Sequence, residues 1–149
     1  MNRTMARAAF TASILSLLLF AVPAGADQAQ AKRPAGREKV IFQVSDADPA
    51  KWNLTLNNAS NVQKDVGGRG ADIEIVAYGP GIGMLKMESV VANRVGEAIA
   101  SGVRIVACEN TMHAQKLGRE DMLGRIGYVK AGVVELMRKQ RQGYAYIRP

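Results

Sequence analysis

The chain has 149 residues, of which 48% are hydrophobic, with one cysteine and a formal net charge of +7. A single cysteine excludes an intramolecular disulfide, and no cluster of His, Cys and carboxylate residues has metal-ligand spacing, so neither a metal nor another cofactor is expected. The basic residues lack the interleaved aromatic residues of single-strand-binding grooves, which argues against nucleic acid as a partner.

The first 26 residues have the parts of a secretory signal peptide. Arg3 and Arg7 precede an apolar run over residues 8–22, and an Ala-Gly-Ala triplet ends at Ala26. The run is shorter than the roughly 20 apolar residues of a membrane-spanning helix. We therefore expect cleavage after Ala26 and a periplasmic or secreted protein with no membrane contact after cleavage. An uncleaved membrane anchor is the alternative.

The rest of the chain is long enough for one domain and too short for two. Without the two arginines of the signal peptide it keeps 18 basic and 13 acidic residues, a net charge of +5. Outside the cytoplasm, a charge of this size favours solubility or the attraction of small anions. We expect a disordered leader over residues 27–38 and a single domain over residues 39–149.

Strand and helix patterns alternate in the first half of this domain. Residues 39–44 form an apolar, β-rich run that predicts a buried strand. Asp48 and the proline after it are a helix start, so a helix is expected over residues 49–64. Residues 72–78 predict a second strand. The loop over residues 79–83 holds three glycines and a proline, a composition that predicts irregular structure.

The alternation continues in the second half. An apolar stripe from Met87 to Ile99 at helical spacing predicts a helix that Gly102 ends. A later helix is expected from its own stripe of Val133, Leu136 and Met137. The remaining patterns predict strands over residues 103–108, 126–129 and 144–147, a short helix over residues 111–117, and an end of the last helix at Gly143.

This order of elements predicts an α/β fold, a mostly parallel sheet with helices on both faces. The strands are near-continuous apolar runs, as burial on both faces requires. In open sheets of this kind, ligands bind outside the carboxyl ends of the strands. Three segments meet at that edge: residues 45–46 (Ser-Asp), the glycine loop, and residues 108–111 (Cys-Glu-Asn-Thr).

Cys108 ends the third strand, just before a predicted helix whose N-cap is Asn110 or Thr111. A thiol near a helix N-terminus faces unpaired N–H groups and the positive end of the helix dipole, which stabilise the thiolate and lower its pKa. Cys108 is therefore a candidate catalytic nucleophile, and a small buried hydrophobe is the alternative. His113, the only histidine, is a candidate base and ligand-binding residue, or else an ordinary surface residue.

Gly79, Gly81 and Gly83 are candidate ligand-binding residues, because successive backbone N–H groups in such a loop can form an anion nest. The alternative is a tight turn that passes close to a neighbouring loop. The loop is not G-x-G-x-x-G and follows the second strand, so a dinucleotide fingerprint is a poor match. A flavin or nucleotide domain would rest on fold analogy and this loop alone. The apolar side chains of residues 84–87 are expected in the core or at a subunit contact.

Five segments carry a pattern that covers nearly all of residues 39–149. They are residues 43–46 (QVSD), 52–61 (WNLTLNNASN), 76–82 (VAYGPGI), 102–112 (GVRIVACENTM) and 131–149 (AGVVELMRKQRQGYAYIRP). In this order they resemble the DsrE/DsrF-like proteins of intracellular sulfur oxidation. The resemblance implies a three-layer α/β/α fold with a five-stranded parallel sheet, and assembly into homo-oligomers, either trimers or hexamers.

The resemblance also implies a chemistry. In sulfur-relay members, a cysteine on the loop after a strand carries sulfur as a persulfide and works with partner subunits and a sulfur-transfer protein. Cys108 occupies what looks like that position. The leading hypothesis is a periplasmic DsrE-like protein that binds or relays sulfur on Cys108, with possible sulfur-carrier or sulfurtransferase-like activity and a sulfur donor or acceptor protein as partner. Asn110, Thr111 and the glycine loop then supply N–H donors to the thiolate or persulfide.

A second hypothesis is a non-catalytic module. In that case the same strand-end crevice holds a small ligand or a partner, and Cys108 is structural.

Overall fold

The computed structural model of this protein describes residues 36–67 and 70–149. The expected signal peptide, its cleavage site after Ala26 and most of the expected leader lie outside the described residues. No helix in the described part of the chain is long and apolar enough to cross a membrane.

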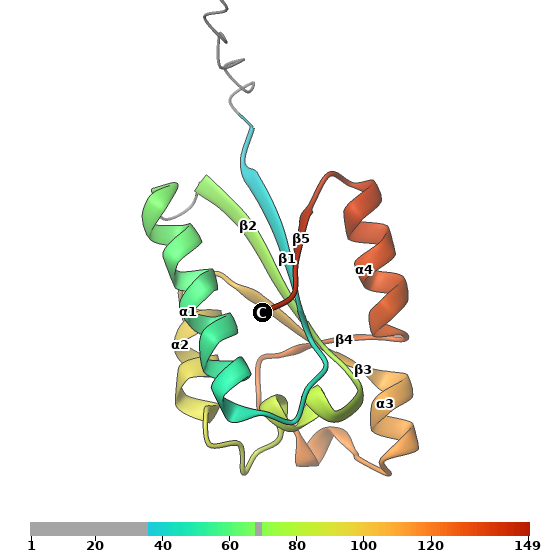
Figure 1. Cartoon of the computed structure of the whole chain (residues 1–149). Helices are drawn as coiled ribbons and strands as arrows, with labels where there is room; N and C mark the ends of the chain where they lie inside the picture. The colour runs from blue at the N-terminus through green and yellow to red at the C-terminus, as the bar shows by residue number, and fades with distance from the viewer. Residues whose placement is uncertain (1–35, 68–69) are drawn as a thin grey trace, which may run out of the picture. The chain divides into compact units, whose positions relative to one another are not determined.

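Five parallel strands form one sheet with the order β4-β3-β2-β1-β5. The strands are β1 (Glu38–Val44), β2 (Ala71–Ala77), β3 (Arg104–Cys108), β4 (Gly127–Val129) and β5 (Ala145–Ile147). The helical elements are α1 (Pro49–Asp65), η2 (Gly79–Leu85), α2 (Ala92–Ala100), α3 (Glu109–Ala114), η3 (Arg119–Asp121) and α4 (Gly132–Arg141). This arrangement confirms the predicted α/β fold with a parallel five-stranded sheet (Figure 1).

Helix α1 begins where the sequence predicts it. Asp48 is the N-cap, its carboxylate accepts the Ala50 N–H at 2.8 Å, and Pro49 occupies the first turn, where its missing N–H costs nothing. Trp52 and Leu56, four residues apart, then fall on one buried face of the helix. Burial of two side chains of this size contributes about 1.5–3 kcal/mol each.

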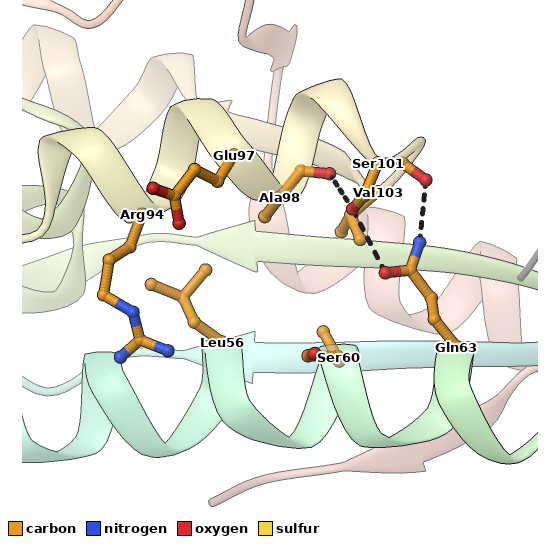
Figure 2. A pocket seen from close by; sticks show the side chains of 9 residues that line it. Leu56, Ser60, Gln63, Arg94, Glu97, Ala98, Ser101 and Val103 are labelled. Atoms are coloured by element: carbon orange, nitrogen blue, oxygen red, sulfur yellow. Dashed lines mark hydrogen bonds between the residues drawn. The ribbon is translucent and has the colours of Figure 1, made fainter.

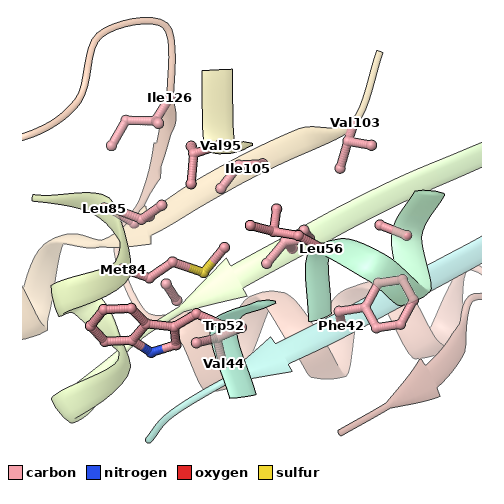
Figure 3. Close-up of a cluster of buried hydrophobic side chains, with 14 of the residues drawn as sticks. Phe42, Val44, Trp52, Leu56, Met84, Leu85, Val95, Val103, Ile105 and Ile126 are labelled. Atoms are coloured by element: carbon pink, nitrogen blue, oxygen red, sulfur yellow. The ribbon is translucent and has the colours of Figure 1, made fainter. Parts of the chain in front are cut away.

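The sheet has two unlike faces. α1 and α2 cover one face over a large apolar core that includes Phe42, Ile75 and Ile105 (Figures 1 and 3). α4 packs on the other face, over a smaller cluster to which β1 contributes Ile41. Phe42 and Ile41 are neighbours that point to opposite faces, as the two-residue period of a strand dictates.

A buried ionic cluster lies between the sheet and α4. The Glu74 carboxylate, on β2 and 1% exposed, pairs with Arg104 of β3 and with the Lys139 ammonium of α4 at 2.9 Å. The Glu135 carboxylate pairs with Arg138 at 2.6 Å and lies 3.9 Å from the Lys139 ammonium. One oxygen of Glu74 has no hydrogen-bond partner among the described residues. This face of the domain is therefore held by paired charges as well as by apolar contact.

That cluster explains one error of the sequence interpretation. The predicted apolar stripe of the last helix included Val133 and Met137, but both side chains are about half exposed. α4 instead turns Glu135, Leu136 and Lys139 toward the sheet. The predicted helical period is correct. The buried face of α4 is nevertheless partly polar, because its charged residues pair with charges on the sheet.

The predicted helix before Gly102 is present as α2, but its predicted start at Met87 is wrong, since α2 begins at Ala92 and Met87 is 63% exposed. Residues 85–87 pair with a distant segment. The Met87 N–H donates to the Asp121 carbonyl at 2.9 Å, and Leu85 accepts the Leu123 N–H at 2.8 Å. Leu85 ends η2, Lys86 is extended, and these bonds keep the segment outside α2. Met84 and Leu85, expected in the core or at a subunit contact, are fully buried in the core.

Candidate functional site

The carboxyl ends of all five strands meet at one edge of the sheet, because the sheet is entirely parallel. Cys108 is the last residue of β3 there, between the neighbouring strands β2 and β4. Tyr78 follows β2 and Lys130 follows β4. The edge therefore brings a thiol, a phenol and an ammonium-bearing residue to three adjacent strand ends.

Cys108 is the N-cap of α3, which begins at Glu109. The predicted N-cap at Asn110 or Thr111 is therefore wrong, because the strand passes directly into the helix without a connecting loop. The Cys108 side chain is 4% exposed and lies on the α4 side of the sheet. Its Sγ accepts the backbone N–H of Gly132, the first residue of α4, at 3.3 Å, and the Lys130 carbonyl oxygen lies 3.9 Å away.

Thr111 links the thiol to the glycine segment. Its hydroxyl hydrogen-bonds to the Cys108 Sγ and at the same time accepts the Gly79 N–H at 2.9 Å. Gly79 was predicted to donate its N–H to the thiol. Instead it donates to the Thr111 hydroxyl, which lies between Gly79 and the thiol. The Asn110 N–H donates to the Lys130 carbonyl at 3.1 Å, which ties the start of α3 to the end of β4.

These contacts act on the ionisation of the thiol. Burial raises the pKa of Cys108, and hydrogen bonds from the Thr111 hydroxyl and from the N–H groups of Gly132, Thr111 and Asn110 lower it. The hydrogen bonds prevail, so the pKa of Cys108 lies below its ordinary value. Cys108 lies at the start of both α3 and α4, and the sequence predicted such a position for α3 alone. This position favours the thiolate form of Cys108.

Gly132 and Tyr78 are site residues that the sequence interpretation did not single out. A Cβ on Gly132 would lie 3.0 Å from Cβ and Cδ1 of Tyr78, so a larger residue at the start of α4 would require Tyr78 to shift by a few tenths of an ångström. Burial raises the pKa of Tyr78, and the nearby Tyr146 adds to that rise. In the sequence, the only indication of this role was that Gly132 comes directly before the apolar stripe of α4, and this is a weak indication.

The glycine segment is a short 3₁₀ helix, η2, and not the irregular loop that its composition predicted. Two of its N–H groups are engaged: Gly79 donates to the Thr111 hydroxyl, and Gly81 donates to the Tyr78 carbonyl at 3.1 Å. A Cβ on Gly81 would lie 2.4 Å from the Val44 carbonyl oxygen. The close approach to β1 therefore requires glycine at this position, as the tight-turn alternative proposed. Ligand binding by these glycines stays a prediction.

Gly83 and His113 lie apart from the thiol contacts. A Cβ on Gly83 would lie 3.2 Å from the Trp52 ring, so this glycine makes room for the indole. His113 is exposed in the last turn of α3, and no hydrogen bond or ion pair of its imidazole occurs within residues 36–67 and 70–149. Across the same residues, no group of three His, Cys, Asp or Glu side chains is placed to hold a metal ion.

A groove of about 530 Å³ lies beside the site, lined by Asn110, residues 128–131, Val134, Glu135 and Arg138. A smaller cavity of about 220 Å³ lies between α1 and α2 on the other face of the sheet (Figure 2). There Gln63 and Ser101 hydrogen-bond to each other across the two helices. Of these two hollows in the described part of the chain, the groove adjoins the Cys108 contacts.

Comparison with known proteins identifies the family. A model of the DsrE/DsrF-like family matches residues 38–149. A protein of unknown function from Methanobacterium thermoautotrophicum (MTH1491) is similar in structure, with 34% identity and a TM-score of 0.72 over 75% of this chain and 99% of its own. A conserved protein of unknown function from Bacteroides thetaiotaomicron (BT1422) has the same fold, with 18% identity and a TM-score of 0.61 over 75% and 95% of the two chains. No curated protein matches. The chain belongs to the DsrE/DsrF-like family.

Proposed function

We propose that this protein carries sulfur as a persulfide on Cys108. The observation that supports the proposal is the set of donors around the sulfur: the Gly132 N–H, the Thr111 hydroxyl and the N–H groups at the start of α3 favour an anionic sulfur. The thiolate is the nucleophilic form of cysteine, so a lowered pKa increases the reactive fraction. The same donors suit the negative charge of a persulfide.

The chemistry is a thiol exchange on a sulfane sulfur. The Cys108 thiolate attacks the outer sulfur of a donor persulfide, a new S–S bond of about 2.0 Å forms at Sγ, and the donor leaves as its thiolate. A thiolate of an acceptor reverses the step, takes the outer sulfur and restores the Cys108 thiolate. No external oxidant or reductant is required in either direction.

The proposal includes a location and an assembly. An exported chain would carry out this exchange in the periplasm or outside the cell, with a donor or acceptor found there. Members of the family often form oligomers, and we propose a homo-oligomer, trimer or hexamer, for this chain. Fractionation of cells that express the full chain, N-terminal sequencing of the product and light scattering test the export, the cleavage after Ala26 and the assembly.

Intact-mass spectrometry tests the persulfide. Purified protein incubated with inorganic polysulfide should gain the mass of one sulfur atom, and the Cys108→Ser variant should gain none. Treatment with a reductant should remove the added mass, since a persulfide is reducible and an oxidised sulfinic acid is not. A native protein that gains no sulfur under these conditions overturns the proposal.

A second candidate function is a binding module in which Cys108 only fills space, and the 4% exposure of its side chain favours this candidate. Thiol labelling distinguishes the two. A structural cysteine reacts with iodoacetamide only as fast as the domain opens, and labelling accelerates sharply in urea. A sulfur carrier reacts in the folded state, with a rate that follows the ionisation of the thiol.

A further inference from the structure

The groove beside the Cys108 contacts offers a place for the donor molecule. Its wall includes Lys130 and Ala131, the connection from β4 to α4. The sulfur lies beside this connection, 3.9 Å from the Lys130 carbonyl and 3.3 Å from the Gly132 nitrogen. The groove and the thiol therefore border the same two-residue connection.

The lining of the groove suits a small organic molecule. Val129, Ala131 and Val134 supply apolar surface, and Asn110 supplies an amide. Pockets that hold small ligands have this mixture of apolar walls and a few polar groups, at volumes of about 300–1,000 Å³. The groove, at about 530 Å³, is within that range.

The charge of the groove selects an anion. Arg138 is neutralised by Glu135, with which it pairs at 2.6 Å. The Lys130 side chain is exposed and makes no ion pair or hydrogen bond with any residue in the described part of the chain. One uncompensated positive charge therefore remains at the rim, and a carboxylate on the ligand complements it.

We propose that this groove binds the organic part of a low-molecular-weight persulfide that bears a carboxylate, and that this molecule is the sulfur donor of Cys108. The inference rests on the proposed persulfide function and names its substrate class. In the step, Cys108 Sγ bonds to the outer sulfur, which keeps its proton, and the donor S–S bond breaks. The electron pair of that bond leaves with the donor thiolate, which diffuses out of the groove.

Binding is tested without the chemistry. S-methylglutathione, a carboxylate-bearing thioether that cannot transfer sulfur, should bind the Cys108→Ser protein saturably in calorimetry. Val134→Phe fills the groove from a half-exposed position and should abolish this binding. Absence of binding to the Cys108→Ser protein overturns the groove proposal and leaves the persulfide proposal standing.

The rate of sulfur transfer tests the charge. With glutathione persulfide as donor, Lys130→Gln should slow persulfide formation about threefold to fivefold at low salt, as expected for loss of one exposed charge contact. With the diethyl ester of the same donor, the variant should match the native protein. Lys64→Gln, on the exposed end of α1, is the control and should change neither rate. Equal effects of Lys130→Gln and Lys64→Gln on the rate of persulfide formation refute the proposed binding of the donor in the groove. Absence of sulfur transfer from every donor refutes the persulfide function itself.

Discussion

Replacing Gly81 by alanine tests how the glycine segment supports the thiol. The added Cβ would lie 2.4 Å from the Val44 carbonyl oxygen and 2.8 Å from the Ser45 nitrogen, both of them backbone atoms that cannot rotate away. The φ angle of Gly81 is not in the left-handed region, so the cost comes from contact alone. To relieve it, η2 must move away from the end of β1.

The expected loss of stability has two parts. Overpacking of this kind costs about 1–3 kcal/mol. The same Val44 carbonyl accepts the Tyr78 N–H at 3.0 Å, and displacing it weakens a bond of about 1 kcal/mol. Together the loss is roughly 2–4 kcal/mol, which for a domain of this size lowers Tm by roughly 8–15 °C.

Urea unfolding and thermal denaturation of Gly81→Ala measure this loss, with Gly96→Ala as the matched control. Gly96 lies in α2, and a Cβ there would meet no atom within 4 Å, so alanine at this position should stabilise the domain by about 0.5–1 kcal/mol. The displacement of η2 also reaches Thr111 through the Gly79 N–H, so thiol alkylation should slow in Gly81→Ala. Equal stability of the two variants would refute the packing argument.

Two further variants probe the site and the face beneath α4. Thr111→Val removes a hydroxyl bonded to the Cys108 sulfur, so the pKa of Cys108 should rise. The pH profile of iodoacetamide alkylation should therefore move to higher pH. The alkylation rate at neutral pH should fall about tenfold, which corresponds to the free energy of one hydrogen bond to a charged group. Thr111→Ser should keep the native profile, and an unchanged profile in Thr111→Val would contradict the assigned contact. Lys139→Met leaves the buried Glu74 with Arg104 alone and should destabilise the domain by roughly 3 kcal/mol in urea. Adding Glu74→Leu should recover most of that loss; failure to recover it would show that the charges are not the cause.

The strands were predictable because a buried parallel strand needs only a local run of apolar residues. The predicted bounds of β1, β2 and β3 agree with the structure within one residue at each end. α1 was predictable for the same reason, since Asp48 and Pro49 begin the helix by local hydrogen bonding and local geometry. The alternation of these elements then determined a parallel sheet, and with it the edge at which Cys108 lies.

Non-local contacts explain the failures. The apolar stripe begins at Met87, but the bonds of Leu85 and Met87 to residues 121–123 keep this segment out of α2. The glycine segment forms a 3₁₀ helix because η2 packs against the end of β1. The buried face of α4 follows the charge of Glu74, which belongs to another element. In each case a partner more than 30 residues away supplies the deciding interaction.

The sequence by itself determined the order of the strands and helices and placed the only cysteine at a strand end beside a helix start, because periodicity and capping are local. It could not show which groups surround the sulfur. Gly132 comes from the helix after the next strand, and Gly79 acts through Thr111 from the preceding crossover. Only the tertiary structure brings these donors to Cys108, since strands distant in sequence are adjacent in a parallel sheet.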